Sequence, residues 1–446
     1  MKRLVAVAGA GAIALALSAC GPTVERSDDE GAASGEEPAA TGETDWSTVE
    51  PADQISFWSN HPSGSIDLEK EIIANFEAET GIKVDLVTAG ANYNEVSQKF
   101  QTAQVSGDAG DLVVLSDTTW FPAYLNGSIT PLDEILEAAG NDTSTYHDSF
   151  YEDYLYEGSH YAVPYARSTI LFFYNKDHYA AAGVADETPA TWDDVKEASL
   201  KIKDAGVSDT PFGYPSDTYF PSWTMSNLVW GYGGDWSDGW DFSAATSEAT
   251  VAAMQFAQDS ITDGWGAVLS GDPTTDFSAG AVSQILASTG GLRGILDTAD
   301  FEVGIGFLPG GPVETEKVVP TGGAGVGIAS NSTPEKQLAA AMFATYLTNP
   351  ENTAFFSGGT GYLPVQKDAD MSAVYADNPQ FEIAVDELPM TRSQNFARVL
   401  VPGGAMVLDQ GIMKILVNSD DVVTTLEGVE TELQSIFDRD LKATVN

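Results

Sequence analysis

The feature that most constrains the fold is a repeated alternation of strand and helix patterns that begins at residue 54. Short apolar runs typical of buried strands alternate with longer segments whose apolar residues recur at helical spacing. The predicted elements are strand 55–58, helix 66–80, strand 83–88, helix 93–105 and strand 111–116. This order predicts a parallel or mixed sheet with helices on both faces. Ligands of such sheets bind beyond the carboxyl ends of the strands.

A second strand pattern lies at residues 163–177, where branched and aromatic side chains follow one another from Thr169 to Tyr174. It stands between two long alternations, so we interpret it as the first crossover between two lobes, with its polar residues facing a ligand. Further elements are predicted as helices 191–205 and 247–263, strands 283–288 and 301–307, a helical connector 386–397 and a final helix 421–441. The glycine-rich run 318–330 indicates either close backbone packing or a backbone brought near a ligand, since glycine permits both.

The N-terminus carries the pattern of a secretory signal. Met1, Lys2 and Arg3 form a basic start, an apolar run of signal-peptide length follows, and Leu17-Ser18-Ala19 precedes Cys20. The small residues before Cys20 resemble the lipobox of bacterial lipoproteins, in which the cysteine is acylated and becomes the mature N-terminus. Residues 1–20 are therefore expected to be a lipoprotein signal peptide. Residues 21–52 have almost no large apolar side chain before Trp46, which predicts a disordered acidic tether.

The charge balance excludes several classes of partner. The chain has 20 Lys+Arg against 66 Asp+Glu and a net charge of -46, so nucleic acid or an anionic membrane surface would repel it. Cys20 is the only cysteine, which excludes a disulfide framework and a cysteine-based metal site. No later run is long enough to span a bilayer.

Catalytic and metal motifs are missing from the sequence. The four histidines have no ligand spacing, and no GxSxG, HExxH or P-loop pattern occurs. At 235–241 a calcium loop would need Glu at its twelfth position, where Thr246 stands. We expect no cofactor and no metal. An extracellular glycoside hydrolase remains the alternative of another class, because the separation of paired carboxylates, which the sequence does not give, decides that chemistry.

Five stretches together resemble the solute-binding proteins of bacterial ABC importers, the family that includes maltose-binding protein. They are Ile55-Ser56-Phe57-Trp58, Gly127-Ser128-Ile129-Thr130-Pro131-Leu132, the run 163–177 with its YNKD, the Thr-Trp-Asp-Asp of 191–194, and Gly361-Tyr362-Leu363-Pro364-Val365. They follow the family's order over residues 53–445. The resemblance implies a two-lobed periplasmic-binding-protein-like α/β fold with several hinge crossovers and a ligand cleft between the lobes. The expected lobes are 53–163 plus 309–358 and 164–308 plus 359–446.

The resemblance also implies a function. The chain would be a monomeric, non-catalytic lipoprotein that captures a solute and delivers it to a membrane permease, anchored to the outer face of the cell membrane through acylated Cys20. It is most similar to the glycerol-3-phosphate-binding subgroup. The ligand contacts that carry over from that subgroup are Tyr93, Asp117, Ser168, Ser288, Gly323 and Tyr362.

The subgroup's arginine does not carry over, because residues 401–405 read Val-Pro-Gly-Gly-Ala and Arg392 and Arg398 lie upstream. A phosphate dianion would then lack a bidentate partner. We therefore expect a neutral sugar, an oligosaccharide or a zwitterionic glycerophosphodiester, with glycerol-3-phosphate as the alternative. Arg167 either meets an anionic ligand group or pairs with an acid, and we favour the acid.

Sugar sites combine carboxylates or amides with aromatic faces. Besides Tyr93 and Tyr362, the stacking candidates are Trp120, Tyr219, Trp223 and Trp230, although aromatic residues more often serve core packing. An acid beside aromatic faces would also suit a quaternary ammonium group.

Overall fold

The computed structural model describes residues 44–216, 218 and 220–445. The predicted signal peptide, Cys20 and most of the predicted tether lie outside the described residues. The end of that tether is folded, which corrects its predicted boundary at residue 52. Trp46, in the short helix η1 (Trp46–Thr48), packs against a core cluster, and the Ala52 N–H donates to the Glu335 carbonyl at 2.9 Å. In the sequence, the one indication that this segment packs on the folded body is Trp46, a large apolar residue near the end of a polar stretch.

The first sheet has the strand order β2-β1-β3-β13-β6. Its strands are β1 (Gln54–Ser59), β2 (Lys83–Thr88), β3 (Leu112–Ser116), β6 (Val163–Ser168) and β13 (Gly322–Ile328). β1 pairs in parallel with β2 and β3, through the helices α1 (Ile66–Thr80) and α2 (Tyr93–Ser106), so the predicted alternation is confirmed. β13 runs antiparallel to β3 and β6, which makes the sheet mixed.

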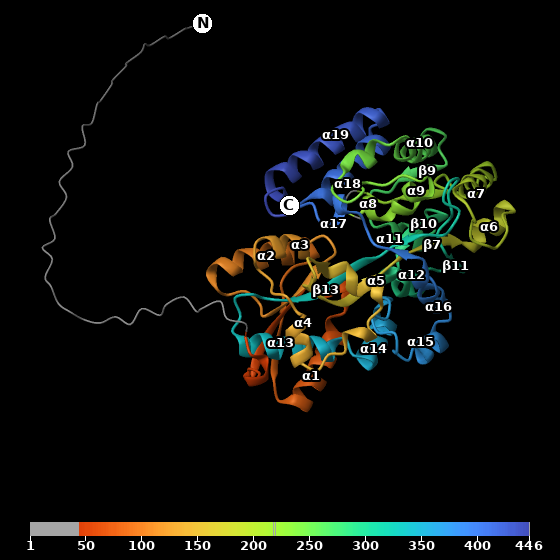
Figure 1. The fold of residues 1–446 in the computed structure, drawn as a ribbon. Coiled ribbons are helices and arrows are strands. Elements are labelled where there is room, and N and C mark those ends of the chain that lie inside the picture. Colours follow the sequence, from red (N-terminus) through yellow and green to blue (C-terminus); the bar gives the residue numbers. More distant parts are fainter. Residues whose placement is uncertain (1–43, 217, 219, 446) are drawn as a thin grey trace, which may run out of the picture. The chain divides into compact units, whose positions relative to one another are not determined.

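The second sheet has the order β11-β7-β10-β8-β9. Its strands are β7 (Ile170–Asn175), β8 (Phe212–Tyr214), β9 (Gly266–Val268), β10 (Gln284–Ser288) and β11 (Val303–Gly306). β7 is antiparallel to both of its neighbours, whereas β8, β9 and β10 are parallel. Figure 1 shows the β13 label in one sheet and the β7, β10 and β11 labels in the other.

The crossover lies later in the chain than the sequence suggested. β6 belongs to the first sheet and β7 to the second, so Thr169 links them and the expected boundary between residues 163 and 164 is wrong. Both strands are fully buried, and one continuous apolar run therefore conceals the break between them. The chain returns to the first sheet between β11 and β13, and the short strand β12 (Val319–Pro320) that lies between them belongs to a separate two-stranded sheet. The other lobe boundaries remain a prediction.

The predicted helical connector 386–397 is also wrong. It contains the short helix η8 (Leu388–Met390), the strand β14 (Thr391–Arg392), which pairs with β12, and part of α17 (Phe396–Val399). Pro389 lacks a backbone N–H and cannot continue a helix in this position.

The remaining helices cover the two sheets. They are α3 (Trp120–Leu125), α4 (Asp133–Ala138), α5 (Asp148–Tyr151), α6 (Lys176–Ala182), α7 (Trp192–Asp204), α8 (Pro221–Thr224), α9 (Ser226–Gly231), α10 (Glu248–Thr262), α11 (Pro273–Ser278), α12 (Leu292–Thr298), α13 (Pro334–Leu347), α14 (Pro350–Thr360), α15 (Ser372–Asp377), α16 (Gln380–Asp386), α18 (Gly404–Val417) and α19 (Val422–Ile436). α7 begins at a reciprocal capping box between Thr191 and Asp194. Within the described ranges, no helix is long and apolar enough to cross a membrane.

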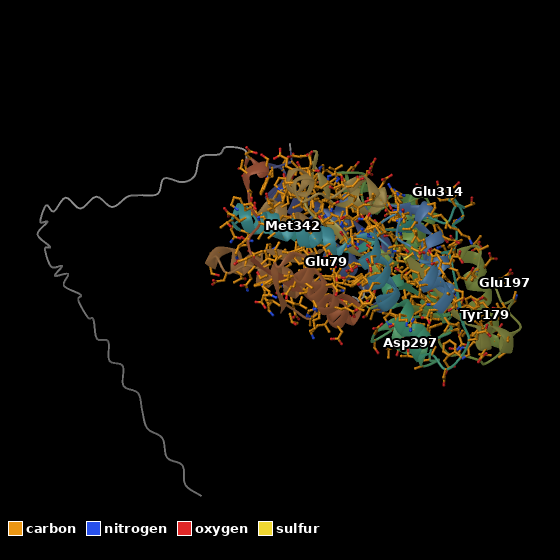
Figure 2. All side chains as sticks on the ribbon, turned by 90° about the horizontal axis from the view of Figure 1, so that it is seen from below. Glu79, Tyr179, Glu197, Asp297, Glu314 and Met342 are labelled. Carbon is orange, nitrogen blue, oxygen red and sulfur yellow. The ribbon has the colours of Figure 1, made fainter. Side chains whose placement is uncertain are left out.

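Aromatic side chains form the core beside each sheet. On the first sheet, the Phe343 ring lies 5.6 Å from Phe57 and 5.1 Å from Phe76 between centroids. On the second, the Phe212 ring lies 5.8 Å from Trp192. The carboxylates of Glu197, Asp297 and Glu314 lie at the periphery in Figure 2, and all three residues are exposed. This arrangement agrees with a solvated acidic surface.

Candidate functional site

Asp117 is the centre of a buried polar cluster at the carboxyl end of β3. Its backbone N–H donates to the Gly323 carbonyl at 3.0 Å, which joins it to β13. Its Oδ2 accepts hydrogen bonds from Gln394 Nε2 at 2.6 Å and from Arg398 Nη1 at 2.8 Å. Asp117 and Arg398 are only 8% and 3% exposed. The acid that follows the third strand is thus bound by residues from the C-terminal part of the chain.

The expectation that no arginine reaches this region is therefore wrong. Arg398 lies in α17, which begins after the N-cap Asn395, and its position is set by that cap rather than by the sequence 401–405. An available signal was the setting of Arg398 among Phe396, Ala397, Val399 and Leu400, because an arginine that is buried with such a run needs a paired partner.

A second ion pair lies on β6. Arg167, which is fully buried, pairs through Nη2 with Asp153 and donates from Nη1 to the Tyr154 hydroxyl at 2.8 Å. Its guanidinium also lies over the Phe150 and Tyr154 rings, at 5.3 and 5.2 Å from their centroids. Burial raises the pKa of the Asp153 carboxyl, and Arg167 opposes that rise. The expectation that Arg167 pairs with an acid is confirmed.

Two tyrosines meet beside these ion pairs. Tyr93 begins α2, where the Asn92 side chain caps the helix, and its hydroxyl lies 3.1 Å from that of Tyr362, which follows α14. The next residue, Leu363, donates its N–H to the Arg167 carbonyl at 2.8 Å. Burial raises the pKa of both hydroxyls, so both stay protonated at neutral pH.

The remaining small residues of the predicted site lie at strand ends. Ser168 is the last residue of β6, is 2% exposed and pairs in register with Gly322. Ser288 ends β10 and accepts the Gly290 N–H at 3.1 Å through its hydroxyl. Gly323 has φ +95°, and a Cβ there would lie 2.1 Å from the Ala166 carbonyl oxygen. Close backbone packing therefore requires glycine at this position.

The tryptophans have different surroundings. Trp223 on α8 donates from Nε1 to the Thr321 carbonyl at 2.9 Å, and its ring covers Gly322. Trp120 is 1% exposed and packs against Tyr154, with 6.0 Å between ring centroids, so it forms part of the core behind Arg167. Trp230 lies under Arg392, whose guanidinium is 4.5 Å from the ring centroid. Tyr219 lies outside the described residues.

Two buried nitrogen atoms of these ion pairs have no hydrogen-bond partner, the Nε of Arg167 and the Nε of Arg398. Buried donors are normally satisfied, so unpaired donors beside two ion pairs are suited to the oxygen atoms of a polar solute. A cavity of about 760 Å³ lies elsewhere, beside β9 and α18, and shares no residue with this cluster. Its lining, which includes Val268 and Met413, is mainly apolar, so the polar cluster is the better candidate on chemical grounds.

Glu387 is a buried carboxyl near the crossover. It is 1% exposed and precedes η8, with the Thr169 hydroxyl, the Leu308 N–H and the Lys317 charge around it. Neither carboxyl oxygen has a hydrogen-bond partner of good geometry. Burial raises the pKa of this carboxyl well above its usual value.

The structure brings together most of the predicted ligand contacts. The segments that carry Tyr93, Asp117, Ser168, Gly323, Tyr362 and Trp223 are joined by the bonds above, and Ser288 ends a strand that pairs with β7. Sequence reasoning missed Asp153, Tyr154, Gln394 and Arg398. Among residues 44–445, with 217 and 219 set aside, no group of three or more His, Cys, Asp or Glu side chains is arranged to hold a metal ion.

Two α/β sheets are joined at Thr169 and again between β11 and β13, and a buried polar cluster lies where their segments meet. This arrangement defines the class of two-lobed, hinged solute-binding proteins. The chain belongs to the family described as bacterial extracellular solute-binding proteins, whose model matches residues 71–383. Members of this family and its structural neighbours bind substrates rather than transform them.

Individual relatives agree with this assignment. The crystal structure of UgpB from Mycobacterium tuberculosis in complex with glycerophosphocholine is 39% identical, covers 87% of this chain and 99% of that one, and has a TM-score of 0.82. The sn-glycerol-3-phosphate-binding periplasmic protein UgpB of Rhizobium meliloti is 25% identical over 85% of this chain and 92% of its own length. The GacH receptor of Streptomyces glaucescens, at 20% identity, 87% and 100% coverage and a TM-score of 0.75, shares the fold.

Proposed function

We propose that this chain is the substrate-binding component of an ABC importer, that it captures a glycerophosphodiester of the glycerophosphocholine type, and that it delivers this solute to the membrane permease. Two relatives support the ligand class. The 39% identical protein was crystallised with glycerophosphocholine, and the Rhizobium protein is named for sn-glycerol-3-phosphate.

The observation that carries the choice between these ligands is the pairing of each buried arginine with its own carboxylate. Arg398 binds Asp117 and Arg167 binds Asp153, so the cluster has no surplus of positive charge. A buried dianion needs such a surplus to offset the loss of its hydration, whereas a zwitterionic phosphodiester brings no net charge. The unpaired Nε groups suit phosphate oxygens.

A neutral oligosaccharide is the second candidate, because it satisfies the same charge balance. The aromatic faces of Tyr93, Tyr362 and Trp223 would then stack on sugar rings. The same aromatic faces beside Asp117 would suit the trimethylammonium group of a choline ester, and the higher identity to the glycerophosphocholine complex favours the phosphodiester.

Attachment to the cell forms part of the proposal. Cys20 would be acylated after removal of residues 1–19 and would hold the monomeric protein at the outer face of the membrane. Capture and delivery need no chemical step, so the protein is proposed to have no catalytic activity. Replacement of Cys20 by serine should release the protein into the medium, and continued membrane association would contradict the anchor.

The ligand is tested by calorimetry and thermal unfolding of the purified protein with glycerophosphocholine, glycerol-3-phosphate and maltose. A ligand at one hundred times its Kd stabilises a protein by about 2.7 kcal/mol. For a folded body of about 400 residues this corresponds to a rise in Tm of about 3 °C. Glycerophosphocholine should produce the largest rise. Tighter binding of glycerol-3-phosphate would refute the charge argument, and turnover of any of the three would refute the binding-only function.

A further inference from the structure

The loop between β1 and α1, residues 60–65, has an unusual backbone. His61 and Ser63 have φ values of 53° and 52°, although neither is glycine. Left-handed backbone at such residues is uncommon and persists where surrounding contacts hold it, often at functional sites. The contacts that hold this loop come from several elements of the first sheet.

Glu69 organises these contacts. It is fully buried in the first turn of α1 and accepts hydrogen bonds from the Ser59 hydroxyl at 2.7 Å and from the Tyr165 hydroxyl at 3.1 Å. Its other oxygen pairs with Nδ1 of His61, while His61 Nε2 lies 2.7 Å from the Thr88 hydroxyl at the end of β2. Both ring nitrogens of His61 are thus fixed, and the first sheet sets the shape of the loop.

This shape directs Ser63 toward the second sheet. The Ser63 hydroxyl donates to the Gly290 carbonyl at 2.8 Å, and Gly290 lies in η7 (Thr289–Gly291), immediately after β10. The Gly290 N–H is held in turn by the Ser288 hydroxyl at 3.1 Å. A Cβ on Gly290 would lie 3.0 Å from the Tyr362 ring. Ser63 therefore makes its bond directly beside the two tyrosines of the candidate site.

We propose that Ser63 is a latch residue, which holds the two lobes closed over a bound solute through its hydrogen bond to the Gly290 carbonyl. The two partners belong to different sheets, so hinge opening separates them and hinge closure joins them. Ser63 positions the lobes and is not itself required to touch the solute. Because this bond forms only on closure, its loss accelerates solute release and leaves capture unchanged. The inference rests on the proposed solute-binding function but not on the identity of the solute.

The test compares Ser63→Ala and Ser63→Gly with the parent protein by stopped-flow fluorescence with glycerophosphocholine. Both variants lose the hydroxyl, but glycine also relieves the left-handed backbone, so an effect common to both belongs to the hydroxyl. We expect the dissociation rate constant to rise about 5-fold, the factor that corresponds to one neutral hydrogen bond. The association rate constant should not change. A parent-like dissociation rate in Ser63→Gly would overturn the latch.

Ser330→Ala is the matched control. Its hydroxyl also donates to a glycine carbonyl, that of Gly127, at 2.5 Å, and both residues lie on segments that adjoin the first sheet. Losing this bond leaves the link between the sheets intact, so the rate of solute release should equal that of the parent. An equal acceleration in Ser330→Ala would show that the effect is not specific to closure.

A distance measurement keeps the latch testable if glycerophosphocholine does not bind, which would refute the proposed ligand alone. Spin labels at Val105→Cys on α2 and Val423→Cys on α19, in a Cys20→Ser background, report the separation of the lobes; both positions are exposed. Ser63→Ala should shift the distance distribution toward longer separations without any solute. Identical distributions for the parent and the variant would overturn the latch.

Discussion

The pair formed by Arg398 and Asp117 gives the sharpest test of the site. Arg398→Met keeps much of the apolar stem and removes the guanidinium. Asp117, 8% exposed, then remains as a buried carboxylate whose remaining side-chain donor is Gln394 Nε2 at 2.6 Å. Removing one partner of a buried pair costs about 3–5 kcal/mol. Because Gln394 still donates, we expect the lower end of that range, about 3 kcal/mol.

Thermal unfolding without solute measures this cost. With an unfolding entropy of about 2.1 cal/mol/K per residue over about 400 residues, 3 kcal/mol corresponds to a fall in Tm of about 4 °C. The double variant Arg398→Met with Asp117→Asn should recover most of this loss, because a neutral amide tolerates burial without a cation. A Tm within 1 °C of the parent for Arg398→Met, or a double variant no more stable than the single one, would refute the assignment of this pair as a buried, mutually dependent unit.

Three further predictions concern single positions. Gly323→Ala should lower the unfolding free energy by at least about 2 kcal/mol, because residue 323 has φ +95° and the new Cβ would lie 2.1 Å from a carbonyl oxygen. An unchanged Tm would contradict this. Tyr362→Phe removes the 3.1 Å contact with Tyr93 and should weaken solute binding about 5-fold in calorimetry; full affinity would exclude this hydroxyl from the site. The pKa of Glu387 is higher in the native state than its usual value of 4.5. Above pH 4.5 the native state therefore binds more protons than the unfolded chain, and the free energy of unfolding falls as the pH rises toward the native pKa. Glu387→Gln should remove this fall between pH 5 and 8, and parallel Tm profiles of variant and parent would show that Glu387 does not titrate as inferred.

Local patterns predicted the elements of the first sheet because helical and strand periodicity are encoded over a few residues. Helix α1 and strand β2 lie where their apolar spacing indicated. The crossover at Thr169 was missed because β6 and β7 are both buried and their sequences merge into one apolar run. The periodicity of apolar residues does not show where one buried strand ends and a second strand, in another sheet, begins.

The candidate site was predicted in part, and the omissions have a common cause. Tyr93 and Asp117 follow strand ends, where the topology of an α/β sheet directs attention, whereas Ser288 was named through the resemblance to the glycerol-3-phosphate-binding subgroup. Arg398 was missed because its partner, Asp117, is 281 residues away and no local pattern links the two. Ser63 was missed for the same reason, since its partner Gly290 is 227 residues distant. Long-range pairing depends on the complete fold.

The position of β13 in the first sheet governs when that sheet can form. β13 lies between β3 and β6 and pairs with both, yet it follows every other strand of its sheet in the chain. Until residues 322–328 have been synthesised, β3 and β6 each keep an unpaired edge. Contacts of such large sequence separation slow folding, and unpaired edges invite association with other chains. The first sheet is therefore completed later than the second, whose strands all precede residue 322.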